Sequence, residues 1–175
     1  MAVGARGAPL TRALRAAGAA LLDLAVPKRC ALCGRFDTFL CDACTAELSP
    51  AVSPRCPTCW GLLDRSRCWS CAAVLGSSLA GVRAAYQLEG GARRLVHMLK
   101  YEGCSALAEP MGRLMAGQFL DWGIRPEIVT AVPLHPSRQR QRGFNQAGQL
   151  ARACAAATGL PLDTNLLARV RRTEP

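Results

Sequence analysis

The chain has 175 residues, half of them hydrophobic, and a formal net charge of +10. This length allows one medium domain or two small ones, and the composition allows a packed core. A basic balance of this kind favours anionic partners, such as phosphate groups, nucleic acid or a membrane surface. No apolar run approaches the roughly 18 residues of a spanning helix, so we expect no membrane span.

Residues 1–29 are rich in alanine and are expected to form a helical lead-in. Their leucines recur near helical spacing, at Leu10, Leu14, Leu21 and Leu24. The alternative is a signal peptide, because arginines precede the apolar run "AAGAALLDLAV". That run is short and Asp23 interrupts it. We therefore favour the helix, a cytoplasmic location and reduced cysteines.

Residues 30–75 hold eight of the ten cysteines, as four Cys-x-x-Cys pairs. A unit of two pairs repeats after 26 or 27 residues, and one unit supplies the four thiolates of a tetrahedral zinc. This repeat predicts two sequential sites, and an interleaved arrangement is the alternative. The predicted ligands are Cys30, Cys33, Cys41 and Cys44, then Cys56, Cys59, Cys68 and Cys71. Gly34 is expected to adopt a positive φ in the first knuckle turn.

Both zinc ions are expected to be structural, because four protein ligands leave no open coordination position. A segment of this length with few large apolar side chains buries too small a core, so the metal would supply folding energy. Disulfides are the alternative, and the expected cytoplasmic location disfavours them because it keeps thiols reduced. Two zinc-thiolate sites would lower the formal charge to about +6.

Residues 76–175 show the alternation of predicted strands, turns and helices that is typical of an α/β domain. Strands are expected over 82–89 and 127–134, the second buried and ended by Pro133, and a strand segment with a turn follows over 160–170. Helices are expected over 92–103, with Leu95, Val96 and Leu99 inward, and over 110–122 and 145–159, with Pro110 in a first turn and Gly159 at an end. Gly90 and Gly91 are expected to form a turn.

The stretch "HPSRQRQRGFNQ", residues 135–146, is expected to be a loop between the 127–134 strand and the next helix. Open α/β sheets bind ligands at that position, and helix N-terminal amides favour anions. The guanidinium groups of Arg138, Arg140 and Arg142 match phosphate geometry. The stretch therefore predicts a phosphate site, with a solvated basic loop as the alternative. Phe144 is expected to anchor the following helix rather than stack a base.

The cysteine module, "LVHMLKYEG" and "AVPLHPSRQRQRGFNQAGQLA" together closely resemble the ComF family of competence-associated proteins. The resemblance covers roughly residues 20–175. It implies an α/β fold, in which a double zinc ribbon (30–75) precedes the N-terminal part of a type I phosphoribosyltransferase-like parallel-sheet domain (76–175). The implied phosphate or pyrophosphate-binding residues are Pro133, Leu134, His135, Arg138, Arg142, Asn145 and Gln146. The basic residues expected to contact nucleic acid are Arg93, Arg94, Lys100, Arg138, Arg140 and Arg142.

One departure bears on activity. Type I phosphoribosyltransferases hold the ribose phosphate with two adjacent acidic residues and a Thr-Thr-Gly-x-Thr stretch, and neither is present before the chain ends at "RVRRTEP". We therefore expect a factor that binds single-stranded DNA or a phosphate-bearing ligand during DNA uptake. Its expected partners are DNA, a DNA-uptake helicase or other competence proteins. The alternative is the N-terminal part of a phosphoribosyltransferase, inactive as given, with Mg²⁺ and phosphoribosyl diphosphate used only by a full-length form.

Overall fold

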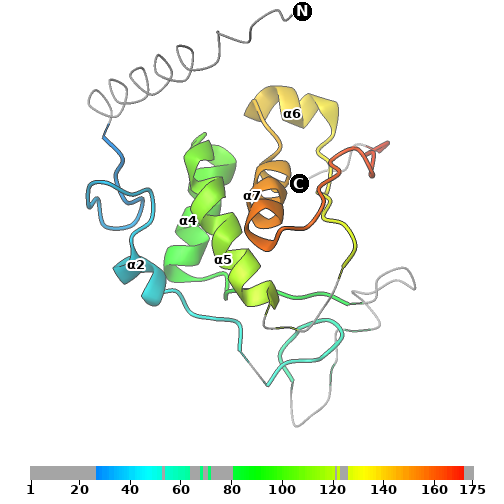
Figure 1. Ribbon diagram of the computed structural model, residues 1–175, viewed down its shortest axis with the longest axis horizontal. Coiled ribbons are helices and arrows are strands. Elements are labelled where there is room, and N and C mark those ends of the chain that lie inside the picture. The colour runs from blue at the N-terminus through cyan, green and yellow to red at the C-terminus, as the bar shows by residue number, and fades with distance from the viewer. Residues whose placement is uncertain are drawn as a thin grey trace, which may run out of the picture.

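The computed structural model describes residues 27–52, 54–63, 68, 71, 81–120, 122 and 126–171. The expected N-terminal helix lies outside this part of the chain, except for residues 27–29, which are not helical. The described helices are α2 (Asp42–Ala46), α4 (Gly90–Tyr101), the short 3-10 helix η1 (Ser105–Leu107), α5 (Ala108–Leu120), α6 (Pro136–Arg142) and α7 (Gln146–Thr158). Helices α4, α5 and α7 form the centre of the molecule, and α6 lies at one end of them (Figure 1).

Helix α4 has the amphipathic face that its sequence predicts. Leu95 and Leu99 are almost completely buried, whereas Arg93, Arg94 and Lys100 are exposed. The helix begins at Gly90, so the two glycines form its first turn and not a separate turn. A Cβ on Gly91 would lie 3.0 Å from side-chain carbons of Leu32 and Leu48. Glycine therefore lets the start of α4 pack closely on the first cysteine unit.

Helices α5 and α7 pack against each other at a glycine. Gly112 of α5 is buried, and a Cβ there would lie 2.9 Å from the carbonyl oxygen of Leu150 in α7. Pro110 lies in the first turn of α5, where it needs no hydrogen-bond donor. Helix α7 ends at Gly159, which has φ 73°. Both of these helix signals in the sequence are confirmed.

The described residues contain β-bridges but no extended strand. Val129 and Leu162 form a parallel bridge, in which Val129 N–H donates to Pro161 O (2.8 Å) and Asp163 N–H donates to Val129 O (3.0 Å). The expected strand over 127–134 is not buried along its length, because Val132 is 67% exposed and Ile128 40%. Within the described residues it pairs on one side only. The expected strand over 82–89 consists of one antiparallel bridge, between Pro50 and Tyr86.

The prediction of a loop over residues 135–146 is wrong for its first half, which forms α6. Pro136 stands in the first helical turn, where its fixed φ suits the helix. The side chain of His135 accepts a hydrogen bond from the Ser137 N–H, and Gly143 ends the helix with φ 80°. Helical start and stop signals thus enclose a run of only seven residues, which was too short to show a periodicity.

Candidate metal centres and anion-binding cleft

The two cysteine units repeat in structure as well as in sequence. In the first, Gly34 N–H donates to Cys30 O (2.8 Å), and in the second, Trp60 N–H donates to Cys56 O (3.0 Å). Antiparallel bridges close both knuckles, Arg29 with Phe36 and Arg55 with Leu62. Gly34 has φ 78°, which confirms the predicted positive value. Trp60 adopts φ 59° at the equivalent position, which is a strained conformation for a residue with a side chain.

The sulfur atoms gather into the two sequential sets that the repeat predicts. One set is Cys30, Cys33, Cys41 and Cys44, and the other is Cys56, Cys59, Cys68 and Cys71. Within each set, all four sulfur atoms lie within 4.8 Å of one another, and none of the ten cysteines is in a disulfide. Tetrahedral zinc with Zn–S bonds of ~2.3 Å requires sulfur separations of about 3.8 Å. The two sets therefore fit two structural zinc ions and a double zinc ribbon.

Backbone N–H groups prepare one thiolate in each set. Burial raises the pKa of Cys30, but N–H groups of Cys33, Cys41 and Leu32 outweigh burial and bring that pKa to about 6. N–H groups of Cys59 and Thr58 lower the pKa of Cys56 to about 6. Because the thiolate is the form that binds metal, Cys30 and Cys56 are suited to take the metal first.

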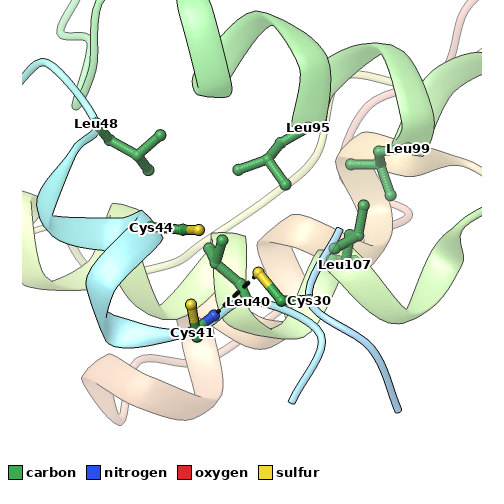
Figure 2. Close-up of a cluster of buried hydrophobic side chains, with 9 residues drawn as sticks. Cys30, Leu40, Cys41, Cys44, Leu48, Leu95, Leu99 and Leu107 are labelled. Atoms are coloured by element: carbon green, nitrogen blue, oxygen red, sulfur yellow. Dashed lines mark hydrogen bonds between the residues drawn. The ribbon is translucent and has the colours of Figure 1, made fainter. Parts of the chain in front are cut away.

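The first cysteine set belongs to the main hydrophobic core. Cys30, Cys41 and Cys44 are buried with Leu40 and Leu48 of the same unit. Figure 2 shows these side chains facing Leu95, Leu99 and Leu107, which come from α4 and η1. The Cys41 N–H donates to the Cys30 sulfur (3.5 Å) within this cluster. A metal at this set would therefore stabilise the helical core as well as its own loop.

The second cysteine set is joined to the rest of the protein through Trp60. The indole N–H of Trp60 donates to Ala51 O (3.1 Å), and its ring lies 6.1 Å from that of Trp122, between centroids. The Arg83 guanidinium lies 4.8 Å from the Trp60 ring centre. None of the four cysteines of this set is part of the core cluster around α4. The two metal sites thus differ in how much structure depends on them.

Basic side chains from α4 and α6 converge on one open cavity of about 770 Å³, called the arginine cleft below. Its lining is formed by Lys100, Tyr101, Gly103, Leu134, Arg138, Gln141, Arg142 and Phe144. Arg138 and Arg142 are one helical turn apart and share a face of α6. The Arg142 guanidinium lies 5.1 Å from the Tyr101 ring centre. Arg140 is exposed and does not line the cleft.

Five of the seven predicted phosphate residues line this cleft or a second cavity, whereas His135 and Gln146 line neither of the two. The second cavity, of about 630 Å³, is lined by Pro133 and Asn145 and by residues of the first turns of α7. Leu134 and Phe144 line both cavities and separate them. The first turns of α7 therefore line a different cavity from Arg138 and Arg142, although Arg142 stays within hydrogen-bond distance of Gln146, the first residue of α7.

Three predicted residues have structural contacts of their own. His135 caps α6 through its ring nitrogen Nδ1, which lies 3.3 Å from Ser137 N. The Asn145 amide donates to Val132 O (3.3 Å). Gln146 is buried and accepts from Arg142 (3.4 Å).

Two further basic residues lie apart from the cleft. Arg93 and Arg94 are at the opposite end of α4, where Arg94 donates to Leu32 O (3.4 Å).

The structure adds cleft residues that sequence reasoning missed. Tyr101 is 64% exposed beside Lys100, and Gln141 is on α6. Tyr101 directly follows Lys100 in "LKYEG", so its position at the helix end was the available signal. Arg152 and Arg169 line the second cavity and had no such signal. Phe144 packs against the main core, as expected for an anchor.

Comparison with known proteins yields two relatives. The DNA utilization protein YhgH of Salmonella typhimurium is 34% identical over 84 residues, which is 45% of this chain and 37% of the relative. The protein of the same name from Salmonella typhi matches with the same identity and coverage. The match therefore spans little more than a third of the length of these curated relatives. No family model and no solved structure matches the chain.

None of the helices in the described part of the chain is both long and apolar enough to cross a bilayer.

Proposed function

We propose that this chain is a ComF-like cytoplasmic protein that binds the phosphate backbone of single-stranded DNA and acts in DNA uptake. The observation that carries the proposal is the convergence of Lys100, Arg138 and Arg142 on one open cleft. Two guanidinium groups offer bidentate hydrogen bonds to phosphate oxygens, and the lysine adds a further positive charge. The basic composition of the whole chain supports an anionic partner.

Helix stability alone is a weaker explanation for these cations. Lys100 and Arg142 are in the last turns of α4 and α6, where positive charge offsets the helix dipole. That effect requires only proximity to the last carbonyl groups. It does not require residues of two helices to line the same cavity.

The relatives support the link to DNA. Both are named DNA utilization proteins. Because the match covers only 37% of their length, the assignment of a DNA-related role to this chain is part of the proposal. The two zinc ions would have a structural role in it. A DNA-uptake helicase or another competence protein is the partner class that the ComF resemblance implies.

The test is binding of a single-stranded oligonucleotide across a salt series. Replacing Arg138 and Arg142 together by glutamine should weaken binding and make the logarithmic salt slope shallower by about 1.4, since each lost phosphate contact removes ~0.7. Arg138→Gln and Arg142→Gln are also measured singly, and Arg140→Gln is their matched control, because it removes one charge from the exposed part of α6 outside the cleft. Equal effects of the control and of each single cleft variant would refute the cleft as the binding site.

The N-terminal part of a phosphoribosyltransferase is the second candidate. The parallel bridge at Val129 is followed by a cavity lined by Pro133 and Asn145 and then by α7, which is the order expected of a pyrophosphate loop. We expect pyrophosphate with Mg²⁺ to bind weakly at that second cavity and no phosphoribosyl transfer from this chain. The alternative outcome is that pyrophosphate competes with the oligonucleotide for the parent chain and that Arg138→Gln/Arg142→Gln abolishes this competition. Both ligands would then bind in the arginine cleft.

A further inference from the structure

A second basic and aromatic feature lies on the first cysteine unit. Phe36 is 49% exposed, and the Arg29 guanidinium lies 4.0 Å from the centre of its ring. The antiparallel bridge between these two residues holds them together beside the Cys30–Cys33 knuckle. An aromatic ring that is half exposed and already stacked on one cation is held ready for a further flat or charged group.

Arg29 of this pair lines a cavity that adjoins the arginine cleft. Arg29 lines a cavity of about 340 Å³ between the first cysteine unit and the turn after α4, and Gly103 is part of the same lining. Gly103 also lines the arginine cleft. The two cavities therefore adjoin at Gly103, and in Figure 1 the blue segment of the first unit and α6 lie on either side of α4.

Positive charge on this surface is local. Lys28, Arg29 and Arg35 are exposed on the first unit, but so are Asp37, Asp42 and Glu47, and a bound zinc with its four thiolates would add a charge of −2. Arg29 is the cation in contact with the Phe36 ring, and Lys100, Arg138 and Arg142 line the cleft. The positive charge that an anion would meet therefore lies at the two features themselves.

We propose that Phe36 and Arg29 form a second contact for the same single strand of DNA that occupies the arginine cleft, with a base stacked on Phe36. This inference rests on the proposed function. A single strand offers bases and phosphates in alternation, so an aromatic platform beyond a basic cleft matches it better than it matches a small phosphate ligand. The repeat sharpens the assignment, because the second cysteine unit has Leu62 where the first has Phe36.

The experiment measures binding of oligothymidylates of two lengths to the zinc-loaded full chain. A strand of about 4 nucleotides should fill only the arginine cleft, whereas one of about 20 should reach both features. Phe36→Ala should weaken binding of the long strand roughly fivefold or more and leave the short strand unaffected. Phe36→Leu keeps apolar bulk without an aromatic face and should behave like Phe36→Ala. Phe36→Trp should retain or improve binding of the long strand.

Leu62→Ala is the matched control, because Leu62 has the equivalent bridge position and is 74% exposed. Leu62→Ala should change neither the affinity for the short strand nor the affinity for the long strand. The zinc content of every variant should equal that of the parent chain. Loss of short-strand binding in the Arg138→Gln/Arg142→Gln variant, together with unchanged long-strand binding in Phe36→Ala and Phe36→Leu, would overturn this inference alone. Unchanged short-strand binding in the double arginine variant would overturn the proposed function itself. Polyglutamate serves as a competitor that carries negative charge but no bases. If Phe36→Ala and the parent chain bind the long strand with equal affinity, and polyglutamate displaces it equally from both, the surface recognises negative charge alone and the inference is overturned.

Discussion

Gly112 of α5 lies so close to Ala153 of α7 that a Cβ on Gly112 would overlap the Ala153 methyl group. The same atom would lie 2.9 Å from Leu150 O and 3.1 Å from Cys154 N, which are backbone atoms that move only with the helix. The contact between α5 and α7 therefore depends on the absence of a side chain at one position.

We expect Gly112→Ala to lower the free energy of unfolding by roughly 1–3 kcal/mol, because overpacking a helix contact forces the helices apart. Gly117→Ala is the matched control in the same helix, with nothing within 4 Å of its added Cβ. It should raise the free energy of unfolding by about 0.5–1 kcal/mol through helix propensity. Urea denaturation followed by circular dichroism measures both, and two effects of the same sign would contradict this packing.

The second prediction concerns the two metal sites. Protein purified without chelator should contain close to two zinc ions per chain. Cys44→Ser should unfold the helical core, since structural zinc binding is worth ~10–16 kcal/mol and whole domains are stable by only about 5–15. Cys71→Ser should lose one zinc and keep the helical signal, because its set lies outside that core.

Metal analysis with circular dichroism measures both effects. Cys104→Ser, outside both sets, is the control and should retain both ions. Loss of helix that is equal in Cys44→Ser and Cys71→Ser would show that the core depends on both sites alike.

The third prediction separates a helix cap from a phosphate ligand at His135. Its ring accepts from Ser137 N–H at the start of a seven-residue helix, so His135→Ala should cost α6 about 1 kcal/mol. Because α6 carries Arg138 and Arg142, oligonucleotide binding should weaken as well. His135→Asn supplies a capping oxygen and should restore binding. Failure of asparagine to restore it, with α6 intact by hydrogen exchange, would indicate a direct contact with the ligand.

The fourth prediction concerns the rate at which the Cys154 thiol is alkylated. Burial raises the pKa of Cys154, so less of it is thiolate at pH 8 than for an ordinary cysteine. Alkylation of Cys154 by iodoacetamide should therefore be slower than that of free cysteine, and its rate should continue to rise at pH values where free cysteine has levelled off. Peptide mass spectrometry of the labelled chain follows the reaction, and a rate profile that matches free cysteine would contradict the burial of this thiol.

Short-range signals in the sequence were sufficient for several features. The spacing of the cysteines predicted both sulfur sets, because zinc coordination within each unit involves residues only 15 positions apart or fewer. Gly34, Pro110 and Gly159 were placed correctly, since each acts through its own backbone angles. The helix of residues 146–158 followed from periodicity over several turns.

Other features required the tertiary structure, because they depend on residues far apart in the chain. Arginines at alternate positions predict one loop site, yet the helical geometry of α6 turns Arg138 and Arg142 to the cleft and Arg140 away. Only packing brings Lys100 and Tyr101 of α4 to that face. The sequence by itself determined which cysteines form the two sets that fit zinc and where α4, α5 and α7 lie. The fold alone decided that the first metal set shares a core with α4, and that five of the seven predicted phosphate residues divide between two cavities, since both result from contacts between elements that no local pattern encodes.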